Sequence, residues 1–252
     1  MKGELGLSYF FIKMQDLKSL FEGKIKGTIA TGCDIEPKYL TDFVGARHGK
    51  ADVYVQALDE EDVKNTLVIA NEHKLPVVVR GAGTNLTGST IPDGGIVLDV
   101  SAMNKILSLD EETLTVTVQP GVLLKDLIAY VEERGYLYAP DPAEKNASIG
   151  GNVSTNAGGM RAVKYGVTRN YVLALDLYKI DGTKVHLGAT TYKYATGLNL
   201  QQLVVGSEGT LGVITKIVLK LLPLPQFTLN AVIAYDSLAL GIKNVNAIFN
   251  AH

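Results

Sequence analysis

A glycine-rich loop between two apolar runs limits most strongly what this chain can fold into. Residues 80–90 read RGAGTNLTGST and follow the apolar run 76–79, and the next apolar run, 94–100, has the composition of a strand. The glycine spacing fits neither the G-x-G-x-x-G pattern of dinucleotide-binding folds nor the Lys-Ser/Thr ending of a nucleotide-triphosphate loop. A Rossmann fold would also require a helix directly after the loop. The sequence therefore predicts a loop that connects two strands.

Hydrophobic periodicity predicts a mixed α and β chain around this loop. Helices are expected at 7–22, 59–75 and 122–135, and strands at 51–58, 76–79, 94–100, 113–121, 171–180, 183–188 and in the apolar run before Pro223. The dipeptide Asp181-Gly182 predicts a hairpin with a type I′ turn. Residues 228–252 read as one further strand and one helix.

Composition excludes several classes of protein. The formal net charge is −2 and no basic stripe is present, which argues against nucleic-acid binding. Cys33 is the only cysteine, so no internal disulfide can form and a reducing compartment is expected. No run approaches the roughly 20 apolar residues of a transmembrane span. We therefore expect a cytoplasmic protein without a transmembrane segment.

Glycine is concentrated in three segments, 81–95, 148–166 and 206–212, which hold half of the 26 glycines. Glycine permits positive φ and lets backbone N–H groups approach a ligand, and successive amides can bind an anion. Tight turns alone would explain one such segment. Three segments that are also rich in Ser, Thr and Asn predict one long, polar ligand that carries phosphate.

Five stretches together resemble a known family. They are RGAGTNLTG, IVLDVSAMNKI, PDPAEKNASIGGNVSTNAGG, KYGVTRNYV and LVVGSEGTLGVITKIVLKLLPLP. In this order they are similar to the FAD-binding domain of the glycolate oxidase / D-lactate dehydrogenase subunit group, in the vanillyl-alcohol oxidase (PCMH-type) superfamily, over about residues 40–225. The resemblance implies an α+β PCMH-type fold in which FAD lies between two α+β subdomains.

The expected organisation follows from this resemblance. An N-terminal helical segment, 1–45, precedes the FAD-binding domain, 46–225, whose subdomains are about 46–105 and 106–225. Residues 226–252 would be the first strand and helix of an incomplete, truncated cap domain.

The resemblance also implies which residues bind the cofactor. The pyrophosphate would be cradled by Gly81, Ala82, Gly83, Thr84, Asn85, Gly88 and Ser89. The flavin ring and ribityl chain would be lined by Pro140, Asp141, Ser148, Gly150, Gly151, Asn152, Ser154, Gly158 and Gly159. The adenine side and pyrophosphate would be met by Glu208, Gly209, Gly212 and Ile214. Members with covalent flavin use a histidine in or near these motifs, and Thr84-Asn85 stand here, so non-covalent FAD is expected.

Catalytic residues are not assigned by the sequence. Hydride transfer from a 2-hydroxyacid needs a base for the hydroxyl proton and a cation for the carboxylate. The four histidines lack metal-ligand spacing, so no metal site is predicted. Arg161, Lys164 and Arg169 follow the second glycine segment, and we interpret them as solvated charges.

Three functions remain open on these residues. The first is an FAD-dependent oxidoreductase that oxidises a D-2-hydroxyacid, with an electron-transfer subunit as a partner. The second is a flavin-binding subunit or remnant that turns over only with a partner. The third is an FAD transferase like alkylglycerone-phosphate synthase. The particular hydroxyacid, the electron acceptor and any homo-oligomer are not readable from the sequence.

Overall fold

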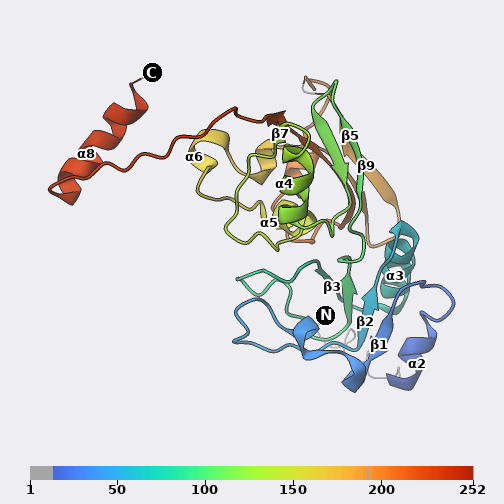
Figure 1. The fold of residues 1–252 in the computed structure, drawn as a ribbon. Helices are drawn as coiled ribbons and strands as arrows, with labels where there is room; N and C mark the ends of the chain where they lie inside the picture. The colour runs from blue at the N-terminus through green and yellow to red at the C-terminus, as the bar shows by residue number, and fades with distance from the viewer. Residues whose placement is uncertain (1–13, 192, 252) are drawn as a thin grey trace.

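The computed structural model describes residues 14–191 and 193–251, and its long strands form two separate sheets (Figure 1). The first sheet has the order β1-β2-β4-β3, with β1 Ile29–Thr31, β2 Val53–Gln56, β4 Ile96–Asp99 and β3 Val77–Arg80. Strands β2, β4 and β3 are parallel, and β1 pairs antiparallel with β2. The loop 81–95 therefore connects two strands, as its sequence predicts, and the structure shows that these strands are parallel neighbours.

Helix α3 (Glu60–His73) covers one face of this sheet. Asp59 caps it by accepting hydrogen bonds from the backbone N–H groups of Glu61 (3.0 Å) and Asp62 (3.1 Å), as N-terminal aspartates commonly do. Its buried residues share a core with Phe21, which follows α2 (Met14–Ser19). The described part of residues 1–45 thus contributes strand β1 to the first sheet and Phe21 to its core. Residues 1–13, which include the start of the predicted helix 7–22, lie outside the described residues.

The opposite face of the first sheet is covered by the chain between β1 and β2. This connection contains two 3₁₀ turns, η1 (Gly32–Asp34) and η2 (Pro37–Leu40). Tyr39 stacks on Tyr54 of β2 with ring centroids 4.2 Å apart. The connection brings residues 41–43 to the carboxyl end of β3, where the glycine loop begins.

The second sheet is antiparallel and has the order β5-β6-β10-β8-β9. Its strands are β5 Ile106–Asp110, β6 Thr115–Val118, β10 Val213–Lys220, β8 Val172–Tyr178 and β9 Lys184–Gly188. Helices α4 (Leu124–Glu132) and α5 (Ile149–Thr155) pack on it through a large apolar core. The smaller elements are β7 Tyr136–Leu137, paired with β11 Leu222–Pro223, and α6 Ala162–Tyr165, η3 Thr168–Asn170 and α7 Gln201–Val204.

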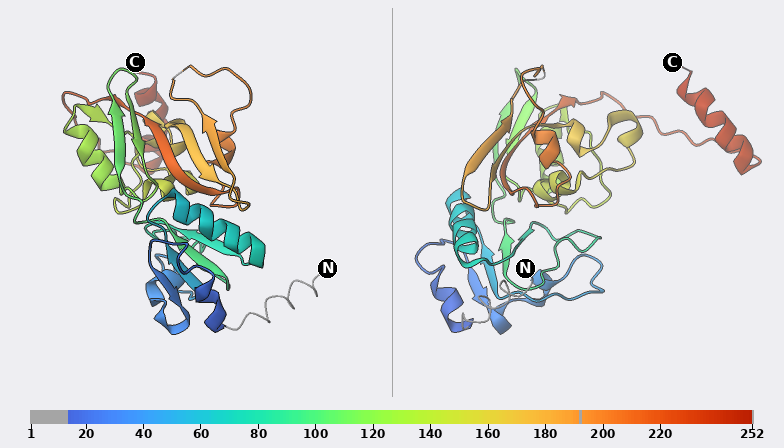
Figure 2. Two further views of the ribbon diagram at one scale, coloured as in Figure 1. Left: turned by 90° about the vertical axis from the view of Figure 1, so that its right-hand side faces the viewer. Right: turned by 180° about the vertical axis from the view of Figure 1, so that it is seen from behind.

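Helix α3 also joins the two sheets at one side of the molecule (Figure 2). Glu60 accepts hydrogen bonds from Thr215 Oγ1 (3.1 Å) and from Lys184 Nζ (2.5 Å), which lie on β10 and β9. Tyr178 and Val213, from the second sheet, belong to the apolar core of the first. Polar and apolar contacts together therefore fix the relative orientation of the two sheets.

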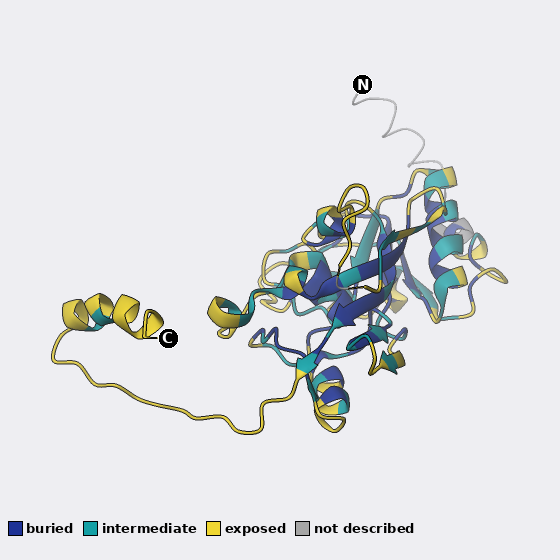
Figure 3. Cartoon of the chain, turned by 90° about the horizontal axis from the view of Figure 1, so that it is seen from above, coloured by how far each residue is buried: buried dark blue, intermediate teal, exposed yellow. Residues whose placement is uncertain are grey.

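The chain leaves the second sheet after β10, passes through β11, which pairs with β7, and ends in helix α8 (Leu238–Phe249). This helix and most of the preceding segment are exposed (Figure 3). The strand predicted in this region does not form, since a strand is stabilised by hydrogen bonds to a neighbour and residues 226–237 have none. None of the helices that the structure describes has the length and hydrophobicity needed to cross a membrane.

Most other elements expected from the sequence are confirmed, and the local differences include the β8–β9 turn, helix α5 and the edge strand β5. Only Gly182 has positive φ in the β8–β9 turn, and its N–H donates to the Lys179 carbonyl (2.9 Å). A type I′ turn needs positive φ at both central residues, so that prediction is wrong and the turn is type I followed by a left-handed glycine. The second difference is α5, a helix within the glycine-rich stretch that lacks helical periodicity.

Candidate cofactor site

The β3–β4 loop is shaped by its own asparagine. The Asn85 side-chain oxygen accepts hydrogen bonds from the backbone N–H groups of Thr87 (3.0 Å) and Ser89 (3.1 Å). Its backbone carbonyl accepts one from the N–H of Phe43 (3.1 Å), which ties the loop to the β1–β2 connection. A Cβ added to Gly88 would meet only Ile91 of the same loop. The outer part of the loop thus contacts itself and the β1–β2 connection, through Phe43 and through Gly49 and Lys50.

The inner part of the loop presents free amides. Within the described residues, the backbone N–H groups of Gly83, Thr84 and Asn85 have no hydrogen-bond acceptor. Gly83 has a φ of 71°, a left-handed conformation that glycine adopts without the penalty a side chain would bring. Consecutive amides without a protein acceptor are groups with which loops bind phosphate oxygens. This stretch is therefore able to hold an anion.

Ser148 joins the first glycine segment to the second. Its buried Oγ accepts from the Gly151 N–H (3.2 Å), which caps α5, and lies 3.4 Å from the Ala82 nitrogen. A Cβ on Gly81 would collide with the same Oγ. The Ser148 hydroxyl thus leaves no room for a side chain at position 81 of the loop, and it caps the N-terminus of helix α5.

The glycines at the start of α5 serve packing. The N–H groups of Ile149 and Gly150 donate to the carbonyls of Val122 and Pro120, both at 2.8 Å. A Cβ on Gly150 would lie 2.6 Å from Pro120 Cβ, so only glycine fits there. These amides are satisfied by protein, as is that of Gly151. The helix therefore offers a different group: the buried side-chain nitrogen of Asn152, which has no partner among the described residues.

The third segment lies against the second segment and against β3, the strand that leads into the first segment. The Glu208 N–H donates to the Ser154 carbonyl (2.9 Å), and a Cβ on Gly209 would be 3.8 Å from Val79 of β3. Glu208 has a φ of 50°, an uncommon conformation for a residue with a side chain. The structure thus brings all three glycine segments together, from three distant parts of the sequence.

Two predicted residues of the third segment have packing roles. Ile214 is buried in β10 opposite Leu177 of β8. A Cβ on Gly212 would come within 2.7 Å of Leu177 Cδ1. Close packing of β10 on β8 explains both residues without a ligand.

The Pro140-Asp141 turn is held by two cations. The Asp141 carboxylate forms ion pairs with Arg161 Nε (3.2 Å) and with Lys145 Nζ. Burial and the charge of Arg161 lower the pKa of Lys145. A Cβ on Gly159 would collide with the Asp141 carbonyl, so the segment after α5 lies directly on this turn. Arg161 is half exposed and paired, which refines its interpretation as a solvated charge.

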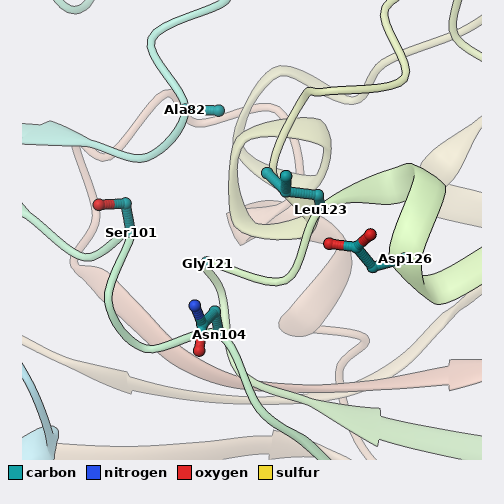
Figure 4. Close-up of a pocket in the computed structure, with 6 residues that line it drawn as sticks. All are labelled: Ala82, Ser101, Asn104, Gly121, Leu123 and Asp126. Atoms are coloured by element: carbon teal, nitrogen blue, oxygen red, sulfur yellow. The ribbon is translucent and has the colours of Figure 1, made fainter.

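A cavity of about 270 Å³ lies next to Ala82 (Figure 4). The other residues that line it are Ser101, Asn104, Gly121, Leu123 and Asp126. None of these was predicted from the sequence, because they come from the turns after β4 and β6 and from the first turn of α4. The turn Gln119-Pro120-Gly121 directly before a helix is a signal that could have drawn attention to them. Ser101, Asn104 and Asp126 could form hydrogen bonds to a small group in this cavity, and Leu123 could pack against an apolar face of that group.

No group of three or more His, Cys, Asp or Glu side chains able to hold a metal ion was found among the described residues. His186 lies instead on β9, where its Nδ1 is 2.5 Å from the buried Asp176 Oδ1.

Comparison with known proteins matches residues 51–188 to a family model described as an FAD binding domain. The chain is 44% identical to a D-lactate dehydrogenase of Anaerostipes hadrus over 227 residues, which are 89% of this chain and 48% of that protein. It is 39% identical to the glycolate oxidase subunit GlcD of Bacillus subtilis, over 92% of this chain and 48% of that protein. The chain thus spans about half the length of these relatives.

Solved structures show the same fold at low identity. An alkyldihydroxyacetonephosphate synthase superposes on 84% of this chain and 40% of its own length, with a TM-score of 0.71 and 22% identity. A likeness at this identity concerns the fold alone. It supports the α+β PCMH-type architecture that the sequence motifs predict.

Proposed function

Because this chain belongs to the FAD-binding domain family, with FAD as its cofactor, we propose that it is the flavin-binding part of an oxidoreductase that oxidises a D-2-hydroxyacid. The observation that carries the proposal is the run of free amides at Gly83, Thr84 and Asn85. These three donors suit a pyrophosphate, and the relatives named above include a D-lactate dehydrogenase and a glycolate oxidase subunit.

The residues present fit the cofactor. The β3–β4 loop would hold the pyrophosphate, and the unpartnered Asn152 amide would donate to a polar edge of the ligand. The Asp141 turn and Gly159 would form the neighbouring wall. Bound FAD supplies a hydride acceptor. The protein residues bind and orient the cofactor, and they leave the base and the substrate cation unassigned.

We further propose that FAD is held without a covalent bond. His186 contacts Asp176 on the second sheet, and the three described histidines lie outside the three glycine segments. Acid precipitation of the purified yellow protein should leave all flavin absorbance in the supernatant. Flavin that remains with the precipitate would contradict this proposal, and a colourless protein that takes up no added FAD would contradict flavin binding itself.

Oxidation of a hydroxyacid is tested by anaerobic mixing. D-lactate, glycolate and D-2-hydroxyglutarate should be added separately to the FAD-loaded chain, and the flavin absorbance followed. Bleaching by the D-enantiomer of lactate, and not by the L-enantiomer, is the expected result. Absence of bleaching with every hydroxyacid would argue against turnover by this chain alone.

The name of the Bacillus subtilis relative favours a second candidate, a flavin subunit that acts within a complex. In that case FAD would be bound but would not be bleached until a partner subunit is added. The two candidates share the same cofactor site, so the bleaching assay separates them while flavin binding stays constant.

A further inference from the structure

Arg80 ends strand β3, directly before the loop, and it is buried with 8% of its surface exposed. Its Nη1 donates one hydrogen bond, to the Thr41 carbonyl at 2.7 Å. Its guanidinium carbon lies 6.0 Å from the centre of the Tyr39 ring. Among the described residues, no carboxylate forms an ion pair with this arginine.

The acidic residue opposite Arg80 in the sheet has other partners. Asp99 stands opposite Arg80 in the register of β3 and β4. Its two oxygens accept hydrogen bonds from the Tyr54 hydroxyl (2.7 Å) and from the Ser101 N–H (2.8 Å). The charges of Asp99 and Asp42 therefore act on Arg80 without an ion pair, and among the described residues the guanidinium has no direct anionic partner.

A buried cation of this kind is costly. Removal of a charge from water is unfavourable unless another charge or several hydrogen bonds compensate for it. Burial lowers the pKa of Arg80, and the nearby charge of Asp99 opposes that shift. An arginine side chain keeps its proton under these conditions. The site thus contains a positive charge that a bound anion would stabilise.

The position of this charge relates it to the loop. A Cβ on Gly83 would collide with the Nη2 and Cζ atoms of Arg80, so the guanidinium packs directly on the Gly83 backbone. Gly83 also begins the run of consecutive residues whose amides have no acceptor among the described residues. The charged group and the unpaired donors therefore belong to one structural unit.

We propose that Arg80 is a positioning residue that supplies the fixed positive charge of the pyrophosphate cradle. It acts through the Gly83 backbone: the guanidinium supports the loop from one side and adds a full charge to the partial charges of the amides. The inference rests on the proposed binding of FAD by this loop. It explains why a loop without its own lysine or arginine side chain suits a dianionic group.

Two substitutions separate the charge from the hydrogen bond. Arg80→Gln keeps a donor for the Thr41 carbonyl and removes the charge, whereas Arg80→Lys keeps the charge. ADP and adenosine differ by the pyrophosphate alone, and each should be used to displace FAD from the loaded chain. In Arg80→Gln we expect the inhibition constant of ADP to rise about tenfold, as loss of one nearby charge in a protein environment implies. Adenosine should be unaffected, and Arg80→Lys should retain most of the ADP affinity.

Arg134→Gln is the matched control, because Arg134 is an exposed arginine that pairs with Glu133 beside α4. It should leave both inhibition constants unchanged.

Two outcomes would overturn the inference. One is a rise of equal size in the inhibition constants of ADP and adenosine in Arg80→Gln. The other is an ADP inhibition constant in Arg80→Lys as high as that in Arg80→Gln. Gly83→Ala provides a second route if Arg80→Gln does not fold, since it displaces the guanidinium and should reduce ADP affinity more than adenosine affinity. If the wild-type chain does not bind FAD at all, that result would instead contradict the proposed function.

Discussion

The Oγ atom of Ser148 lies 3.4 Å from the backbone nitrogen of Ala82, a residue 66 positions earlier in the sequence. The same oxygen accepts a hydrogen bond from Gly151 and so caps α5. One side chain therefore links the β3–β4 loop, which follows a strand of the first sheet, to helix α5, which packs on the second sheet.

Ser148→Ala should weaken both the helix and the cofactor site. Loss of an N-cap typically costs about 1 kcal/mol of stability, and here the loop also loses its contact with α5. We expect a lower melting temperature and a FAD dissociation constant several times larger, measured by flavin fluorescence. Ser237→Ala is the matched control, because Ser237 caps the exposed helix α8 through Leu240 (3.3 Å). Equal FAD affinities in the two variants would show that the Ser148 contact is unimportant for binding.

Gly83→Ala should reduce FAD affinity for two physical reasons. The backbone has a φ of 71°, which is strained for alanine, and the new Cβ would displace the Arg80 guanidinium. Gly23→Ala isolates the first reason, since Gly23 has a φ of 74° but nothing within 4 Å of an added Cβ. Both variants should lose stability, by about 1 kcal/mol or somewhat more. Only Gly83→Ala should lose FAD during gel filtration, and retention of flavin by this variant would argue against a tight fit of the loop.

Gly159→Ala and Gly158→Ala should differ, although the two glycines are neighbours. An added Cβ at Gly159 collides with the Asp141 backbone carbonyl, whereas at Gly158 it meets a Val167 methyl group at 3.1 Å. A backbone atom yields less easily than a side chain. We expect Gly159→Ala to separate the Pro140-Asp141 turn from the segment after α5, with clear loss of thermal stability and of flavin. Similar melting curves for the two variants would show that the turn adjusts freely.

Asp176→Asn should destabilise the second sheet and change its response to acid. Asp176 is buried, with its side chain 4% exposed, and pairs with Lys216 (2.6 Å), Lys184 (3.4 Å) and His186 (2.5 Å). Burial would raise its pKa, but these hydrogen bonds and charges outweigh burial and hold the pKa below its ordinary value. The carboxylate therefore stabilises the fold above the unfolded-state pKa, and this contribution is lost as the pH falls through the folded-state pKa.

The measurement is the free energy of unfolding as a function of pH. Asp176→Asn should lower the free energy of unfolding by about 2 kcal/mol near pH 7, because its partly exposed cationic partners lose a charged acceptor. In this variant the free energy of unfolding should also decrease less steeply below about pH 4 than in the wild type. Asp93→Asn is a suitable control, since Asp93 pairs with Lys50 at the surface, 3.6 Å apart with both side chains largely exposed. A variant whose acid transition matches that of the wild type would contradict this role of Asp176.

The local elements that the sequence predicts correctly are those with clear periodicity. The apolar runs of β2, β3, β4 and β10 and the capped helix α3 are examples. Strand β5 was missed because it is a largely exposed edge strand, ILSLD, without a consistent apolar face. Helix α5 was missed because Ile-Gly-Gly-Asn has poor intrinsic helix propensity. Its stability comes from Ser148 and from Pro120 and Val122, which are distant in sequence.

The sequence by itself determined that glycine and neutral donors gather in three segments, and its motifs indicated the family and the cofactor. Only the tertiary structure decided what each residue does there. It assigned Gly150 and Gly212 to packing, left the amides of Gly83 to Asn85 free, and placed the charge of Arg80 against them. A sequence pattern records which conformations and hydrogen bonds each residue permits. Which of them are used is decided by long-range contacts, such as that of Ser148 with Ala82, that form only when the chain is folded.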